Sequence, residues 1–198
     1  MRILNVLVLI SLVIFYVLFI GRTILLYKKG IKVWVIGSST KNILEILLEN
    51  ILVPVLVFWS VFIIFLALNI KLPRFISMYL INFFWLKYVE IMFCYIGLLI
   101  FLLALISFGK AWRIGIDEKN SNELITEGIF KYTRNPIFLF MDMYFFGMAL
   151  IYPNIVLIVM AICMIIGIHF QIIREEKFLK NKFHEKYNEY RKKTRRYF

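Results

Sequence analysis

Most of the side chains that could do chemistry lie in two polar segments of a strongly apolar sequence. The first, residues 127–138, reads EGIFKYTRNPIF, and the second, residues 169–179, reads HFQIIREEKFL. Two apolar runs joined by Tyr-Pro-Asn at 152–154 separate them. A helical hairpin across a membrane would return both segments to one bilayer face. The sequence therefore predicts a single site built from two segments that are distant along the chain.

The second segment places two acids, Glu175 and Glu176, at the end of an apolar run. Such a pair is costly near lipid unless it faces a polar cavity or a partner. On a helix, Gln171, Arg174 and Glu175 share one face through their i, i+3 and i+4 spacing. Glu176 points about 100° away. We expect the face of Glu175 to turn toward the first segment, and Glu176 to serve a substrate or to brace the residues that follow.

The first segment contains the signals of a helix start. Asn135 followed by Pro136 is typical of an N-cap and the first helical position, and Gly128 is compatible with a simple turn. Each motif alone indicates structure. Their combination directly before a membrane hairpin favours a binding site.

An acidic residue also lies inside the apolar run that follows. Asp142 is six residues beyond Pro136, which places it about 9 Å from the helix start. An acid inside a membrane is a functional candidate, and a structural pair with a Tyr, an Asn or a cation of another helix is the alternative. His169 lacks a second His or Cys at ligand spacing, so we expect no metal. No nucleophile–base pair and no Gly-rich loop after a strand is present.

These segments belong to a chain of membrane spans. Of the 198 residues, 62% are hydrophobic, whereas soluble domains are nearer to half. We predict an all-α, polytopic membrane protein with about five transmembrane helices, a C-terminal helical hairpin and a cytoplasmic amphipathic tail. The expected spans are residues 3–26, 43–68, 88–108, 136–151 and 155–173. Residues 75–86 are too short to span comfortably, so we expect an interfacial or re-entrant piece.

The net charge of +12 predicts the orientation through its distribution. Lys and Arg are concentrated in residues 28–42, in residues 109–135 and from Arg174 onward. By the positive-inside rule, the C-terminus and both halves of the predicted site face the cytoplasm. We attribute the cations to this rule and to contact with membrane lipids, and we expect no nucleic-acid partner. Cys94 and Cys163 lie in apolar runs and form no disulfide framework.

The polar segments resemble those of the isoprenylcysteine carboxyl methyltransferase family and of its relatives, the membrane phospholipid methyltransferases. The superfamily pattern has a Gly, an aromatic–basic pair, Arg-His/Asn-Pro-x-Tyr-x-Gly, a hairpin, and Glu-Glu followed by a Tyr-rich tail. The matching residues here are Gly128, Tyr132, Arg134, Asn135, Pro136, Glu175, Glu176, Tyr187 and Tyr190. The resemblance covers roughly residues 109–198, including WRIG at 112–115. We therefore divide the chain into N-terminal spans, residues 1–108, and a methyltransferase region, residues 109–198.

Three positions depart from the usual pattern. Phe138 replaces Tyr, Asn135 replaces His as a frequent alternative, and Phe140 stands where Gly is common. We expect Phe140 to narrow the pocket beside the cofactor. The departures leave the superfamily unchanged but weaken the transfer of substrate identity.

The resemblance implies methyl transfer from S-adenosylmethionine. The cofactor's ammonium suits an acid, its carboxylate suits an Arg or the amides of a helix start, and its adenine or sulfonium suits aromatic rings. The implied cofactor-binding residues are Gly128, Tyr132, Arg134, Asn135, Pro136, Phe138 and Glu175. The implied catalytic residues are Arg174, Glu175 and Glu176, and those nearest the acceptor are Asp142, Gln171, Tyr187 and Tyr190. We expect Asn135 and Glu175 to contact the same cofactor molecule.

The acceptor that the resemblance implies is lipid-like or prenylated and enters from the bilayer, while the cofactor enters from the cytoplasm. The similarity is greatest to isoprenylcysteine carboxyl O-methylation, and phospholipid N-methylation is the alternative. A carboxylate acceptor is already ionised, whereas an amine must lose a proton, which would make Glu175 or Glu176 a general base. A sterol-type membrane reductase with a nicotinamide cofactor and a non-enzymatic scaffold or transporter subunit stay open.

Overall fold

The computed structural model describes residues 2–33, 43–73, 85–113 and 123–197, with the backbone alone in 43–53. Its elements are the helices α1 (Arg2–Lys28), α2 (Ile43–Ala67), α4 (Leu86–Phe108), α5 (Pro136–Ile151) and α6 (Ile155–Lys193), and the short 3₁₀ helices η1 (Gly109–Ala111) and η2 (Gly128–Lys131). Within these ranges three helices are long and apolar enough to cross a membrane, and two shorter apolar helices accompany them. The predicted all-α, polytopic membrane architecture is confirmed. The segment predicted to be interfacial, 75–86, lies outside the described residues except for its last two.

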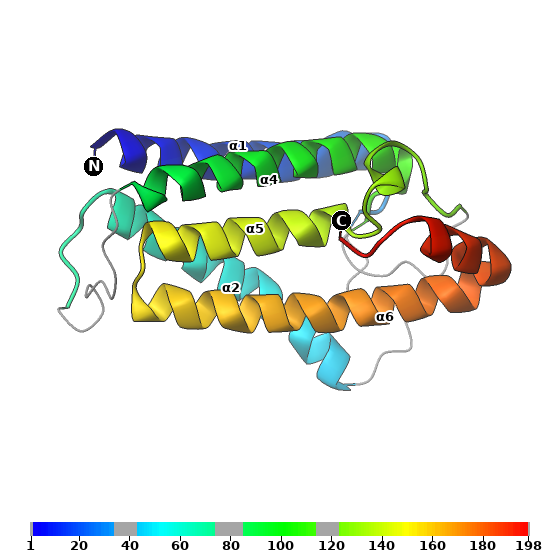
Figure 1. Ribbon diagram of the computed structural model, residues 1–198. Helices are drawn as coiled ribbons and strands as arrows, with labels where there is room; N and C mark the ends of the chain where they lie inside the picture. Colours follow the sequence, from blue (N-terminus) through cyan, green and yellow to red (C-terminus); the bar gives the residue numbers. More distant parts are fainter. Residues whose placement is uncertain (1, 34–42, 74–84, 114–122, 198) are drawn as a thin grey trace.

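α5 lies in the middle of a helical bundle, between α4 and α6 (Figure 1). α1 runs beside α4, and α2 crosses behind to contact α1 and α6. The α5–α6 turn lies at the same end of the bundle as the start of α1, whereas the start of α5 lies at the other end, near the end of the chain. The helical hairpin predicted from the sequence is therefore present, and its open end brings distant segments side by side.

Local signals account for the hairpin. Pro136 occupies the first position of α5, where its missing N–H would have had no helical partner. Asn154 is the N-cap of α6, and its Oδ1 accepts a hydrogen bond from Val156 N at 2.8 Å, which satisfies one free amide of the first turn. At the same turn, Tyr152 OH donates to Asn5 Oδ1 at 2.9 Å and ties the hairpin to α1.

Aromatic rings fill the contact between α1, α4 and α5. Phe140 of α5 stacks on Phe101 of α4 with ring centroids 4.7 Å apart, and its ring centroid lies 5.7 Å from that of Phe15 in α1. Only 2% of Phe140 is exposed. In this structure Phe140 therefore fills the helical core, in contrast to the expectation that it narrows a cofactor pocket.

α5 passes close to α4 at Gly147. A Cβ placed on Gly147 would lie 2.7 Å from Cys94 Sγ, whereas one placed on Gly167 of α6 would meet nothing within 4 Å. Ala raises helix propensity by about 1 kcal/mol at both positions, but overpacking at Gly147 costs about 1–3 kcal/mol. We expect Gly147→Ala to lower the melting temperature in detergent and Gly167→Ala to leave it unchanged or raise it. Equal melting temperatures for the two variants would contradict this packing.

α6 extends well beyond the span predicted for it and bends at His184. The expected span ends at residue 173, whereas α6 continues to Lys193. His184 has φ 43° and ψ −117°, which lie outside the helical region, so the last turns change direction. Figure 1 shows the end of the chain folded back toward the start of α5.

Candidate active site

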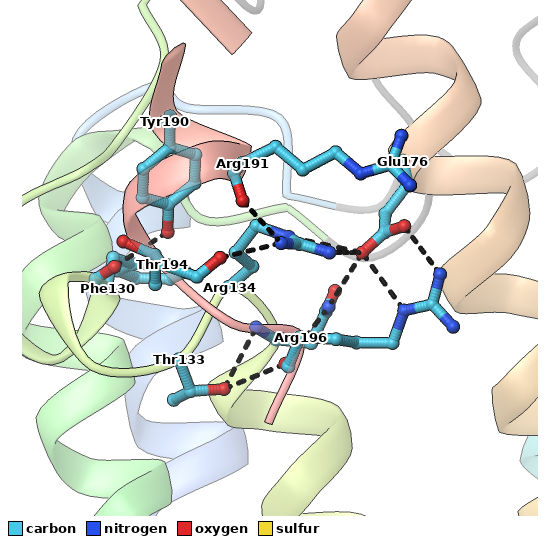
Figure 2. Close-up of polar contacts among 9 residues, drawn as sticks. Phe130, Thr133, Arg134, Glu176, Tyr190, Arg191, Thr194 and Arg196 are labelled. Carbon is cyan, nitrogen blue, oxygen red and sulfur yellow. Dashed lines mark hydrogen bonds and ion pairs between the residues drawn. The ribbon is translucent and has the colours of Figure 1, made fainter. Parts of the chain in front are cut away.

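The open end of the hairpin brings the two polar segments into direct contact (Figure 2). Arg134, just before α5, donates from Nη2 and Nε to Glu176 Oε1 at 2.9 and 3.3 Å. Asn135 Nδ2 donates to the same oxygen at 3.4 Å. The side chains of Arg134 and Glu176 are 8% and 11% exposed. Residues 42 positions apart thus form one shielded, charged group.

The residues after α6, which we call the 194–197 segment, complete this group. Arg196 binds Glu176 through Nη2 and Oε2 at 2.8 Å and through Nε and Oε1 at 3.2 Å. The backbone N of Arg134 donates to Arg195 O at 3.0 Å. Sequence reasoning missed Arg196, because its only signal was one cation among many and its partner becomes visible only when α6 folds back. We call Arg134, Asn135, Glu176 and Arg196 the Glu176 cluster.

The two adjacent acids differ in pKa. Burial raises the pKa of Glu176, but the hydrogen bonds and charges of Arg196 and Arg134 outweigh it and bring this pKa below its ordinary value. Burial and the negative charge of Glu176 raise the pKa of Glu175 from 4.5 to about 7. Paired carboxyls with separated pKa values are typical of sites in which one acid stays charged and the other exchanges a proton.

The side chain that reaches the start of α5 is that of Glu176, whereas the sequence predicted this position for the face of Glu175. Gln171 and Arg174 do share a face, since Arg174 Nη1 donates to Gln171 Oε1 at 3.3 Å. Adjacent residues point about 100° apart on a helix, so the rotation of α6 in the bundle decides which acid faces α5. The half-buried carboxylate of Glu175 accepts no hydrogen bond within the part of the chain that the structure describes.

Asn135 occupies the N-cap position of α5 but does not cap with its side chain. Its backbone O accepts a hydrogen bond from Leu139 N at 2.9 Å. Its Nδ2 instead faces Glu176 and lies 3.4 Å from Arg196 O. Asn135 is therefore the N-cap residue by position, and its side-chain nitrogen donates to the carboxylate of Glu176 and to the carbonyl of Arg196.

Asp142 pairs with Tyr197 of the 194–197 segment. Tyr197 OH donates to Asp142 Oδ2 at 3.0 Å. The other oxygen, Oδ1, is buried and has no hydrogen-bond partner among the described residues. The structural pair with a Tyr, one of the two alternatives from the sequence, is present at one oxygen of Asp142.

Three other predicted residues join η2 to its neighbours. Gly128 has φ 63°, and a Cβ there would overlap Ser107 Oγ of α4, so this position requires glycine. Tyr190 OH donates to Phe130 O at 2.7 Å, and Tyr187 is 1% exposed. Both tyrosines form a small buried apolar cluster with Phe130 of η2. Their role toward an acceptor stays a prediction.

A cleft of about 680 Å³ opens between residues 123–127, the end of α4 and the last turns of α6. Its lining residues are Ser107, Glu123, Leu124, Ile125, Thr126, Glu127, Phe183, Lys186, Glu189, Tyr190 and Lys193. Its volume suits a small-molecule site. Of this lining, only Tyr190 was among the site residues predicted from the sequence, and Glu127 begins the first polar segment. Tyr132 is exposed and Phe138 is partly buried.

Among the described residues, no group of three or more His, Cys, Asp or Glu side chains could hold a metal ion.

Residues 85–186 match the model of the phospholipid methyltransferase family. The match includes α4, η2, α5 and most of α6 and covers more than half of the chain. The chain therefore belongs to the phospholipid methyltransferase family, in the superfamily that also holds the isoprenylcysteine enzymes. The resemblance seen in the sequence is confirmed, and the protein is an integral membrane methyltransferase of a kind that normally uses S-adenosylmethionine. No curated protein matches the chain.

Proposed function

We propose that the protein transfers a methyl group from S-adenosylmethionine to a lipid-like or prenylated acceptor held in the bilayer. The observation that carries this proposal is the junction of Arg134 and Asn135 with Glu176, because it joins both halves of the superfamily pattern at one end of a membrane hairpin. A charged cluster beside apolar helices suits a reaction between a water-soluble donor and a membrane-held acceptor.

The residues at this end fit the amino-acid part of the cofactor. Arg134 and Arg196 surround the single carboxylate of Glu176, which leaves a net positive charge for the cofactor's carboxylate. The carboxylate of Glu175, the residue that precedes Glu176 on α6 and is partly buried, suits the cofactor's ammonium. The cleft lined by Tyr190 has room for a nucleoside-sized group.

The bound cofactor supplies an electrophilic methyl group on a sulfonium. Because methyl transfer is an in-line displacement, the protein acts mainly by positioning the acceptor and by excluding water. Asp142 lies further along α5, and its buried Oδ1 has no hydrogen-bond partner in the described part of the chain. We assign this oxygen to the polar end of the acceptor, whose apolar part stays among the helices.

Binding and transfer can be tested separately on the purified protein in detergent. Titration with S-adenosylhomocysteine should show saturable binding, and S-adenosylmethionine labelled in its methyl group should label an added lipid probe. The two probes are a farnesylated cysteine and a phosphatidylethanolamine. A scaffold or transporter subunit would bind no S-adenosylhomocysteine, and a sterol-type reductase would bind a reduced nicotinamide cofactor in its place.

The first candidate for the methylated atom is a carboxylate oxygen of a prenylated cysteine, supported by the similarity of the motifs to the isoprenylcysteine enzymes. The second is the amine of a phospholipid headgroup, favoured by Glu175, whose carboxyl pKa of about 7 suits proton transfer near neutral pH. Alkali separates the two products, because a methyl ester releases methanol and an N-methyl amine does not. Volatile label after alkali treatment identifies the carboxylate acceptor.

The site is proposed to face the cytoplasm, and the cations concentrated around it support this orientation. The test uses Ile155→Cys, at a position 45% exposed beside the α5–α6 turn, and Lys192→Cys, at an exposed position of α6, both in a Cys163→Ser background. We expect a membrane-impermeant maleimide to label Ile155→Cys in intact cells and Lys192→Cys only after permeabilisation. The reverse pattern would place the site on the outer face.

A further inference from the structure

The 194–197 segment is bonded to the start of α5 along its backbone. Three successive carbonyl groups accept hydrogen bonds of 2.6–3.0 Å from Thr133 and Arg134. These carbonyls belong to Thr194, Arg195 and Arg196. Only 6% of Thr194 is exposed. The segment therefore has a defined conformation against Thr133 and Arg134, the two residues before Asn135 and Pro136.

Arg196 fixes the carboxylate of Glu176 together with Arg134. Oε1 lies 2.9 Å from Arg134 Nη2, and Oε2 lies 2.8 Å from Arg196 Nη2. Figure 2 shows the carboxylate of Glu176 between the two guanidinium groups. Because Oε1 is bound by both arginines and Oε2 by Arg196, the orientation of the carboxylate depends on both arginines.

Tyr197 anchors the segment inside the bundle. Its OH binds Asp142 on α5, and its side chain packs against the main apolar core. The 194–197 segment thus crosses the open end of the hairpin, from Glu176 on α6 to Asp142 on α5.

We infer that the 194–197 segment is a fixed wall of the cofactor site and that Arg196 is a positioning residue, which orients Glu176 and adds the second positive charge beside the cofactor's carboxylate. This inference rests on the proposed function. The family match ends at residue 186, so it assigns no role to the segment.

The bonding of the segment favours a wall over a movable lid. Release of the segment would remove the acceptors of Arg134 Nη1 at Thr194 O and of Arg134 N at Arg195 O. It would also remove the partner of Glu176 Oε2. Shielded donors and a shielded carboxylate without partners are strongly unfavourable. A segment that had to leave before each turnover would break all of these bonds.

The affinity for S-adenosylhomocysteine, measured by calorimetric titration in detergent, tests this inference. We expect Arg196→Gln to weaken binding about tenfold, the effect of losing one charge-assisted contact. Arg196→Lys should bind with intermediate affinity, because lysine keeps the charge but lacks the two-pronged guanidinium. The matched control is Lys192→Gln, which removes an exposed cation from the last turn of α6 and should bind like the parent.

Titration also separates positioning from misfolding, because an unfolded fraction lowers the number of sites without changing the dissociation constant of the remainder. If Arg196→Gln cannot be purified, Arg196→Lys decides. Unchanged affinity in the arginine variants would overturn the inference. Tighter binding would overturn it as well, since it would show that the segment blocks the site. A parent protein that binds no S-adenosylhomocysteine rejects the proposed function itself, and with it this inference, so the two failures are distinguishable.

Discussion

Glu176→Gln is expected to destabilise the open end of the hairpin more than any other single change of charge at this end. The variant leaves Arg134 and Arg196 without their carboxylate, and the Arg134 side chain is 8% exposed. Removing one partner of a buried ion pair costs about 3–5 kcal/mol. The Arg196 side chain is 34% exposed, so water compensates part of the loss of its partner. We therefore expect the free energy of unfolding to fall by about 3 kcal/mol. The melting temperature in detergent should fall by several degrees.

A double-mutant cycle shows whether the loss comes from the uncompensated arginine. Arg134→Met removes the buried cation and keeps an unbranched side chain. We expect Glu176→Gln with Arg134→Met to be more stable than the sum of the single effects predicts. The matched control is Glu185→Gln on the same helix, where the carboxylate is exposed and removal should change little. Additive effects of Arg134→Met and Glu176→Gln would show that the two side chains do not act as a pair.

The hairpin was predictable from the sequence because its signals are local. Pro136 and Asn154 mark the starts of α5 and α6, and the apolar runs between the polar segments set the lengths of the two legs. The two outer ends of a helical hairpin lie at the same end of the bundle, and this does not depend on how the side chains of the two helices pack. The order of polar and apolar segments was therefore enough to predict that the segment of Arg134 meets the segment of Glu176.

Which acid faces α5 was not predictable, because it depends on packing. One residue step changes the direction of a side chain by about 100°, and the sequence on both faces of α6 is compatible with either rotation. The role of Arg196 was also hidden. The contact of Arg196 with Glu176 depends on the bend of α6 at His184. His184 is a non-glycine residue at positive φ, and no sequence signal predicts a bend there. Once α6 bends there, the 194–197 segment reaches the start of α5.

Glu175 is expected to make the folded protein less stable as the pH rises. Its carboxyl pKa is raised from 4.5 to about 7 by burial and by the charge of Glu176. A raised pKa means that the folded state binds this proton more tightly than the unfolded state, so ionisation opposes folding. The penalty begins near pH 4.5, grows through about pH 7 and is constant above it. The shift from 4.5 to about 7 sets an upper limit of about 3 kcal/mol for this penalty, and the partial exposure of the Glu175 residue lowers it.

The difference in melting temperature between the parent and Glu175→Gln isolates this effect, since every other titrating group is common to both proteins. We expect the parent to lose melting temperature relative to Glu175→Gln from pH 5 to pH 8. The lowered pKa of Glu176 acts in the opposite direction and at more acid pH, so it does not obscure this window.

The pH dependence of methyl transfer by the parent and by Glu175→Gln shows whether the titration of Glu175 controls the reaction, which depends on the type of acceptor. With an amine acceptor, the ionised Glu175 accepts the departing proton, so parent activity should rise as the pH passes through about 7, and Glu175→Gln should abolish that rise. With a carboxylate acceptor no base is needed, and the variant should lose cofactor affinity without changing the shape of the pH profile. A parallel stability curve for the parent and Glu175→Gln between pH 5 and pH 8 would show that Glu175 titrates at its ordinary pKa, and would remove it as the base.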